Sequence, residues 1–191
     1  VGDNISEQSS SGVNSSDLYR ELWNLVFIQY NRKQDGSLEE LPVKHVDTGM
    51  GFLRITAILN NKSSNYDTDL FIEIIEKIVK LTGKKYQFNE GVPHRVIADH
   101  IRMLVFSMAD GAMPSNDGRG YVLRRVLRRA ARFGRILKMH EPFIYELVDS
   151  VCKIMGDTFI EIRDKQKHIE KVIKSEELAF NETLDRGLEV Y

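Results

Sequence analysis

Beyond residue 63, most of the chain has apolar residues at the three- and four-residue spacing of amphipathic helices. Asp67 or Thr68 can cap the first helix, and Gly83 can end it. The last apolar run predicts either one long helix or two helices in series. The helices are expected over about 69–83, 96–111, 121–138, 142–155 and 162–191.

Residues 20–62 follow a different pattern. Residues 20–31 are rich in Trp, Val, Phe, Ile and Tyr, which is typical of a buried strand. Asp35-Gly36 predicts a hairpin turn, followed by a return strand over about 44–47. Glycines at 49 and 51 then precede Phe52, Ile55, Ile58 and Leu59 at helical spacing, so we expect a strand, a tight glycine turn and a helix.

These elements predict a mainly α fold with a small antiparallel β part, divided into domains 1–62 and 63–191. Two strands and one helix are too little sheet to be stable alone, so we expect residues 1–62 to belong with further sheet. The chain starts at Val1 in a polar stretch, and we expect it to be a piece of a longer protein. Residues 1–19 are rich in Ser and Gly and are expected to form a loop or a frayed end.

The glycine turn combines groups that suit an anion and a cation. The N-terminus of a helix presents free N–H groups, and Arg54 adds a fork of donors suited to phosphate. Asp47, at the end of the preceding strand, can hold an ammonium group. In the alternative interpretation, this is an ordinary strand–turn–helix in which Asp47 caps the helix.

The predicted helix over 121–138 and the residues before it are unusually basic. No acidic residue interrupts its arginines, which suggests a surface that follows nucleic-acid phosphates. Alternatively, some of them pair with acids elsewhere, such as Asp99, Asp110 or Asp117. Asn116, in the turn before the helix, could read a base edge or could bond its own backbone. The arginines are Arg119, Arg124, Arg125, Arg128, Arg129, Arg132 and Arg135.

The composition narrows the remaining possibilities. The net charge is −1, so nucleic-acid affinity must come from local clustering. Cys152 lies in an apolar run and is expected to be a buried small hydrophobe in a reducing, cytoplasmic setting. No apolar run reaches about 18 residues and no signal peptide is visible, so no membrane association is expected. The histidines lack metal-ligand spacing, and no metal site is expected.

Asp47-Thr-Gly-Met-Gly-Phe-Leu-Arg54 resembles the third signature motif of class II aminoacyl-tRNA synthetases, in the form used by the alanyl-tRNA synthetase family. The match is in order and covers roughly residue 20 to the end of the chain. It implies the C-terminal part of a class II catalytic domain followed by a helical tRNA-recognition domain. The other segments that carry it are Glu21–Arg32, Ser64–Phe71, Arg95–His100 and Pro114–Arg125.

The resemblance also implies roles for individual residues. Alanine would contact Asn24, Val26, Asp47 and Gly49. ATP would contact Leu22, Trp23, Asn24, Gly51 and Arg54. Asn116 would help to recognise the G·U wobble pair in the acceptor stem of tRNA(Ala). The phosphates of that stem would be held by Arg119, Arg124, Arg125, Arg128, Arg129 and Arg132.

The implied reaction is ATP-dependent activation of alanine and its transfer to tRNA(Ala), with Mg²⁺ accompanying the ATP. The zinc of this family belongs to an editing domain outside this chain, and any homo-oligomer would form through regions outside it. The 191 residues alone are expected to be inactive. Leu53 stands where the motif usually has Glu. That departure supports an alternative hypothesis, a catalytically silent paralogue that acts as an RNA-binding module.

Overall fold

The computed structural model describes residues 10–13, 19–87 and 89–189. The predicted N-terminal loop therefore lies mostly outside the described residues, apart from a short 3-10 turn, η2 (Ser10–Gly12). The chain divides into two compact units, Val1–Asn65 and Tyr66–Tyr191. The sequence-based boundary between residues 62 and 63 falls three residues before this division.

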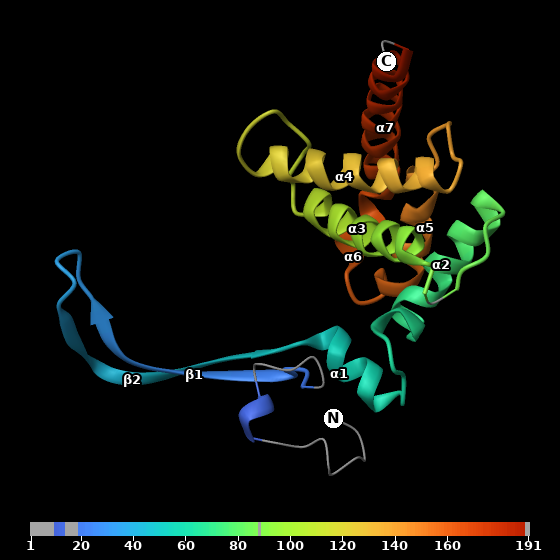
Figure 1. The fold of residues 1–191 in the computed structure, drawn as a ribbon. Coiled ribbons are helices and arrows are strands. Elements are labelled where there is room, and N and C mark those ends of the chain that lie inside the picture. Colours follow the sequence, from blue (N-terminus) through green and yellow to red (C-terminus); the bar gives the residue numbers. More distant parts are fainter. Residues whose placement is uncertain (1–9, 14–18, 88, 190–191) are drawn as a thin grey trace. The chain divides into compact units, whose positions relative to one another are not determined.

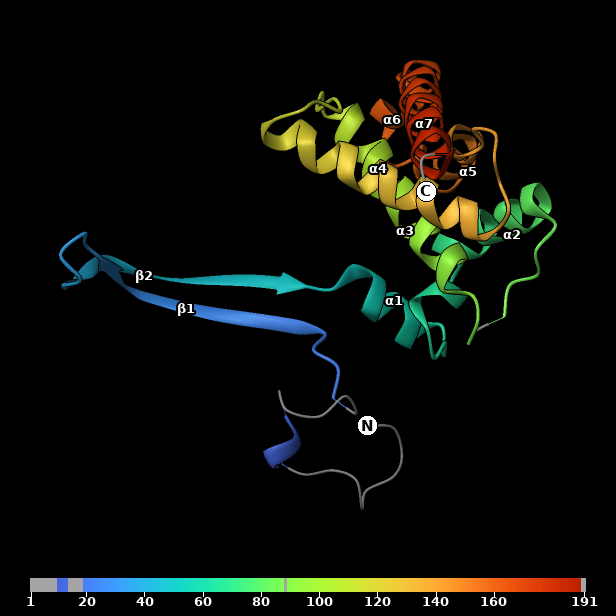
Figure 2. The ribbon, with the colours of Figure 1, turned by 45° about the horizontal axis from the view of Figure 1, so that its top comes forward.

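The first unit is built on a long antiparallel ribbon of two strands (Figures 1 and 2). β1 (Trp23–Arg32) pairs with β2 (Leu38–Met50), and the turn between them has Gly36 at φ +84°. Asp35 accepts hydrogen bonds from the backbone N–H and hydroxyl of Ser37, at 2.9 and 2.6 Å, and so completes the turn. Helix α1 (Phe52–Leu59) follows β2 directly.

The prediction of a buried strand over residues 20–31 is wrong for the described residues. Apolar side chains are exposed on both faces of the ribbon: Phe27 is 76% exposed and Val26 is 47% exposed. A strand buries its apolar side chains only when another layer packs on it, and no described residue of this unit supplies one. The apolar composition therefore indicates side chains that a further layer could cover, but these side chains are exposed in this structure.

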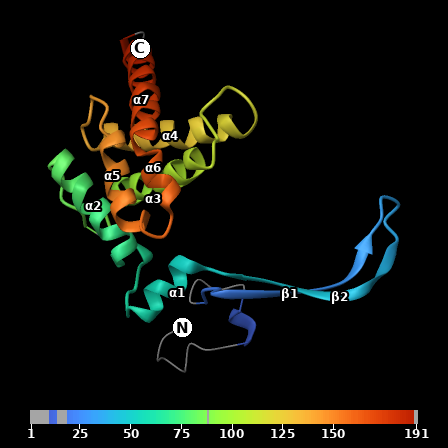
Figure 3. The same cartoon turned by 180° about the vertical axis from the view of Figure 1, so that it is seen from behind.

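The second unit is a bundle of helices (Figures 1 and 3). Helix α4 packs along α3 and against α7, while α2 and α5 pack against α3 and η4 packs against α7. The core is made of fully buried aliphatic side chains, among them Ile78, Ile101, Leu127 and Ile144. The elements are η3 (Asn65–Asp67), α2 (Asp69–Thr82), α3 (Val92–Ala109), α4 (Gly118–Ile136), η4 (Ile144–Leu147), α5 (Val148–Met155), α6 (Ile160–Asp164) and α7 (Gln166–Glu189).

Most predicted helices lie where expected, and the fold class is confirmed as mainly α with a small antiparallel β part. Gly83 ends α2 in the left-handed conformation, at φ +67°. Thr68 is the N-cap of that helix, without a side-chain capping bond. The run over 142–155 is divided into η4 and α5, and the run from 162 is two helices in series, separated at Lys165.

Two further sequence predictions concern burial and membranes. Cys152 is 2% exposed, as predicted for a small core residue, and burial raises the pKa of its thiol to about 11. No helix in the described part of the chain has the length and apolar character needed to cross a bilayer.

Candidate functional site

One face of the ribbon brings together the four residues predicted to contact alanine. In the register, Asn24 is opposite Gly49 and Val26 is opposite Asp47. Residues two apart on a strand share a face, and Cβ atoms of opposite residues lie about 4.5–5.5 Å apart. The register therefore gathers an amide, a small apolar side chain, a carboxylate and a glycine on one small patch.

Asp47 lies in β2 and does not cap α1. Its Oδ1 accepts the backbone N–H of Thr48 at 2.9 Å, which leaves Oδ2 without a partner among the described residues. The N-cap of α1 is Gly51, which has no side chain to occupy the free N–H groups of the first turn. The capping interpretation of Asp47 is therefore wrong.

Trp23 belongs to the opposite face of the ribbon. Its indole N–H donates to the hydroxyl of Thr48, and the side chain is 61% exposed. Since the side chains of neighbouring strand residues point to opposite faces, Trp23 and Asn24 do not share a surface of the ribbon. The predicted ATP-binding residues are thus divided between both faces and the adjoining turn.

The turn after β2 is held against the residues that precede β1. The Gly51 N–H donates to the Leu22 carbonyl at 2.8 Å, and Arg54 Nη1 donates to the Glu21 carbonyl at 2.7 Å. Gly51 has φ −72°, so it does not need the left-handed conformation. These bonds place Leu22, Gly51 and Arg54 together at one end of the ribbon, beside the free N–H groups of α1.

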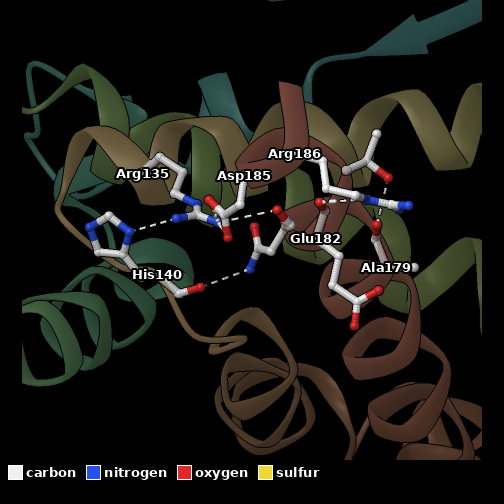
Figure 4. A network of polar contacts seen from close by, with 8 residues as sticks. Arg135, His140, Ala179, Glu182, Asp185 and Arg186 are labelled. Atoms are coloured by element: carbon white, nitrogen blue, oxygen red, sulfur yellow. Dashed lines mark hydrogen bonds and ion pairs between the residues drawn. The ribbon is translucent and has the colours of Figure 1, made fainter. Parts of the chain in front are cut away.

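Three arginines of α4 turn toward α7. Arg124 forms a bidentate ion pair with Glu176, and Arg128 lies over the Phe180 ring at 5.5 Å from its centroid. Arg135 pairs with Asp185 at 2.9 Å and also contacts His140 and the Asn181 carbonyl (Figure 4). Acids do balance part of the arginine series, but they lie on α7 and are not the aspartates considered from the sequence.

The other arginines of the series point outward. Four of them are exposed, and Arg125 has a contact with the Tyr121 ring, 5.8 Å from its centroid. They have no acidic partner among the described residues. The charged side chains on this side of α4 are therefore all basic. We call them the outward arginines: Arg119, Arg125, Arg129 and Arg132.

Asn116 is held in the turn before α4 by a contact that the sequence did not predict. Its side-chain oxygen accepts a hydrogen bond from Arg124, so the alternative of a turn Asn that bonds its own backbone is not what the structure shows. Gly120 lets this turn pack closely: a Cβ there would lie 2.2 Å from Ser115 Oγ and 2.3 Å from the Met113 carbonyl oxygen. The pairing of Arg124 with Glu176 was not predicted, because Glu176 lies 52 residues away and no local sequence pattern indicates the contact.

Comparison with known proteins assigns the chain to a family. The family described as tRNA synthetases class II (A) matches residues 1–191, and the chain belongs to it. The chain is 53% identical over 185 residues to an alanine–tRNA ligase of Chlorobium phaeobacteroides, covering 94% of this chain and 21% of that protein. Alanine–tRNA ligases of Chlorobaculum tepidum and Staphylococcus epidermidis are 54% and 51% identical, and each match covers 90% of this chain and 20% of the relative. The chain therefore spans about a fifth of the length of these relatives.

Proposed function

We propose that this chain is part of an alanine–tRNA ligase, which activates alanine with ATP and transfers it to tRNA(Ala). The observation that carries the proposal is the ribbon register, which places Asn24, Val26, Asp47 and Gly49 on one face. A carboxylate and an amide can bind the two charged ends of an amino acid, and Val26 would help to keep the pocket for its side chain small. The 51–54% identity to alanine–tRNA ligases supports the same substrate.

The chemistry would be positioning together with charge stabilisation. The free Asp47 oxygen would accept the alanine ammonium group, and Asn24 would orient the rest of the molecule. The free N–H groups of α1 and Arg54 would face the ATP phosphates. Arg54 uses one of its five N–H donors on the Glu21 carbonyl, which leaves the others for a ligand.

Class II synthetases use ATP with Mg²⁺, and the residues of this chain suit the nucleotide better than the ion. Among the described residues, no three His, Cys, Asp or Glu side chains lie close enough together to hold a metal. The ion would therefore be bound by the ATP phosphates and by groups other than these. When bound, Mg²⁺ would neutralise part of the negative charge of the phosphates.

The helical unit would recognise the acceptor stem of tRNA(Ala). The outward arginines form a strip without acids, suited to successive phosphates. Asn116 is exposed in the turn that precedes them and would contact a base pair. In this proposal residues 66–191 serve tRNA recognition, and the first unit serves alanine activation.

One observation favours a second candidate, a silent paralogue that only binds RNA. Leu53 replaces the Glu that the signature motif usually has beside Arg54. ATP–pyrophosphate exchange by the intact protein separates the two: exchange that depends on alanine supports the ligase, and exchange at the blank level supports the paralogue.

Asp47→Asn tests the alanine site directly. The loss of a charge-assisted bond to the ammonium group should lower kcat/KM for alanine about 10- to 150-fold, while tRNA binding remains unchanged. The matched control is Asp35→Asn, which changes a carboxylate in the turn of the same ribbon and should leave alanine kinetics unchanged. An unaltered kcat/KM in Asp47→Asn would refute the proposed alanine site.

A further inference from the structure

The regular pairing of the ribbon continues beyond the residues proposed to bind alanine. After the pair Val26–Asp47, the next pair on the same face is Ile28 opposite His45. Two residues along a strand correspond to about 7 Å, so Ile28 and His45 lie about that far from Val26 and Asp47. Both side chains are exposed in this unit, and a ligand on this face of the ribbon can reach them.

The pairing becomes irregular directly after Ile28 and His45. The next pair joins Tyr30 to Glu40, so β1 advances by two residues while β2 advances by five. Pro42 lies in the extra segment of β2 and has no N–H to donate to the ladder. Such a bulge bends the strand and changes where its side chains point, and bulges often lie next to active sites. The regular part of this face therefore ends at Ile28 and His45.

The reaction restricts how an amino acid can lie on this face. In activation, a carboxylate oxygen of the amino acid forms a bond to the α-phosphorus of ATP, and pyrophosphate leaves with the electrons of the bond that breaks. The groups proposed for ATP lie at the α1 end of the ribbon, where Gly51 and Arg54 are held. The carboxylate must therefore point to that end, while Asp47 holds the ammonium group. The direction left along this face for the side chain is away from ATP, toward Ile28 and His45.

We propose that Ile28 and His45 form the end wall of the alanine site and limit the length of the side chain that it accepts. The inference rests on the proposed function in alanine activation. A methyl group occupies only the space beside Val26. A longer side chain meets the branched carbons of Ile28, and it also displaces water from the polar ring of His45. Steric exclusion and desolvation thus act against the same competing amino acids.

The end wall is tested with analogues of alanine that differ from it only in length. L-2-Aminobutyrate and L-norvaline extend the side chain by one and two carbons. The readout is ATP–pyrophosphate exchange by the intact protein, expressed as the ratio of kcat/KM for alanine to kcat/KM for each analogue. One methylene group in a substrate pocket changes such a ratio roughly 10- to 200-fold. Ile28→Ala should therefore lower the alanine-to-norvaline ratio at least about tenfold.

Two further variants test the wall with smaller changes to the ribbon. Ile28→Val removes one methylene group and should lower the alanine-to-2-aminobutyrate ratio about two- to tenfold. His45→Ala removes the ring together with its bound water, and it should lower the alanine-to-norvaline ratio at least about tenfold. Thermal unfolding followed by circular dichroism shows whether each variant is folded. If Ile28→Ala does not fold, Ile28→Val and His45→Ala decide the result.

Matched controls lie on the opposite face of the same two strands. Leu25→Ala shortens an exposed aliphatic side chain of β1, and Val46→Ala shortens one of β2. Leu25 directly precedes Val26, and Val46 directly precedes Asp47, so both controls point away from the candidate alanine site. Both should retain the two ratios of the unchanged protein.

The outcomes distinguish this inference from the proposed function. If the unchanged protein shows no alanine-dependent exchange, the proposed function fails, and the inference fails with it. If it activates alanine but the variants at Ile28 and His45 retain its ratios, or the controls lose them equally, alanine activation stands and the end wall is refuted. If the variants at only one of the two positions retain the ratios, the role of that residue is refuted.

Discussion

The buried carboxylate of Glu177, in the middle of α7, accepts the backbone N–H of Ile144 at 2.9 Å. It also accepts the N–H of Phe143 at 3.1 Å, and so joins α7 to the start of η4. Glu177 is 1% exposed. Burial raises its pKa to about 7, against the opposing effect of the two backbone donors, while Glu146 raises it further. A group that joins two elements of the bundle therefore titrates near neutral pH.

The stability of the helical unit should decrease as the pH rises through this range. The unfolded chain releases the Glu177 proton near pH 4.5, whereas the folded chain retains it to about pH 7. The stabilisation is therefore fully present below pH 4.5 and is lost as the pH approaches 7. A difference of this size corresponds to roughly 3 kcal/mol in the free energy of unfolding.

Glu177→Gln should remove this part of the pH dependence, because a neutral amide of the same shape does not titrate. Urea unfolding followed by helical circular dichroism at several pH values measures the effect, and the comparison with the unchanged chain removes contributions from other groups. Glu182→Gln, an exposed acid on the same helix, is the control. Parallel curves for Glu177→Gln and the unchanged chain would contradict the prediction.

The outward arginines should govern the salt dependence of RNA binding. Replacing Arg129 and Arg132 with Gln should weaken all tRNAs similarly. It should also flatten the log–log salt dependence by about 0.7–0.9 for each lost phosphate contact. The control replaces Lys167 and Lys171 with Gln, which removes the same charge from an exposed part of α7. Equal slopes for the two double variants would show that the arginines do not contact phosphates.

The helices of the second unit could be predicted because the residues that each helix buries recur at helical spacing along the sequence. Gly83 correctly predicted the end of α2, because the residue there adopts the left-handed conformation that glycine favours. The break inside the run over 142–155 was not predicted. There the start of η4 is fixed by Glu177, more than thirty residues away.

The sequence supplied a hypothesis for which residues form the candidate site, but it did not supply their contacts. The resemblance implied roles for Asp47 and Asn24, and the register shows that these two residues share a face with Val26 and Gly49. The acids that pair with Arg124 and Arg135 lie on α7, 52 and 50 residues further along the chain, and sequence spacing does not predict contacts over such a separation. The strand composition indicated burial, but burial depends on a partner layer that composition does not describe.

Leu53→Glu tests whether the departure from the signature motif damages the site. Leu53 is half-buried in the first turn of α1, next to Arg54. If its surroundings have changed together with it, a glutamate there will leave the exchange rate unchanged or lower it. We expect this result for an active ligase, measured as alanine-dependent ATP–pyrophosphate exchange in the intact protein. A gain of tenfold or more, expressed as about 1.4 kcal/mol of transition-state stabilisation, would instead show that Leu53 impairs the site.

Gly49→Ala should separate the alanine site from the stability of the ribbon. A Cβ at Gly49 meets nothing within 4 Å, so the substitution introduces no clash, and an alanine in a strand is at least as stable as a glycine. The new methyl group would lie on the same face as Asn24, directly opposite it, in the space proposed for the substrate. We expect the KM for alanine to rise at least about tenfold, the equivalent of about 1.4 kcal/mol of binding, with an unchanged melting temperature.

Gly36→Ala is the control and should give the reverse pattern. Because Gly36 is at φ +84° in the turn, an alanine there should cost about 1–3 kcal/mol in stability and leave the alanine kinetics normal. If Gly49→Ala has normal alanine kinetics, alanine does not bind on this face of the ribbon.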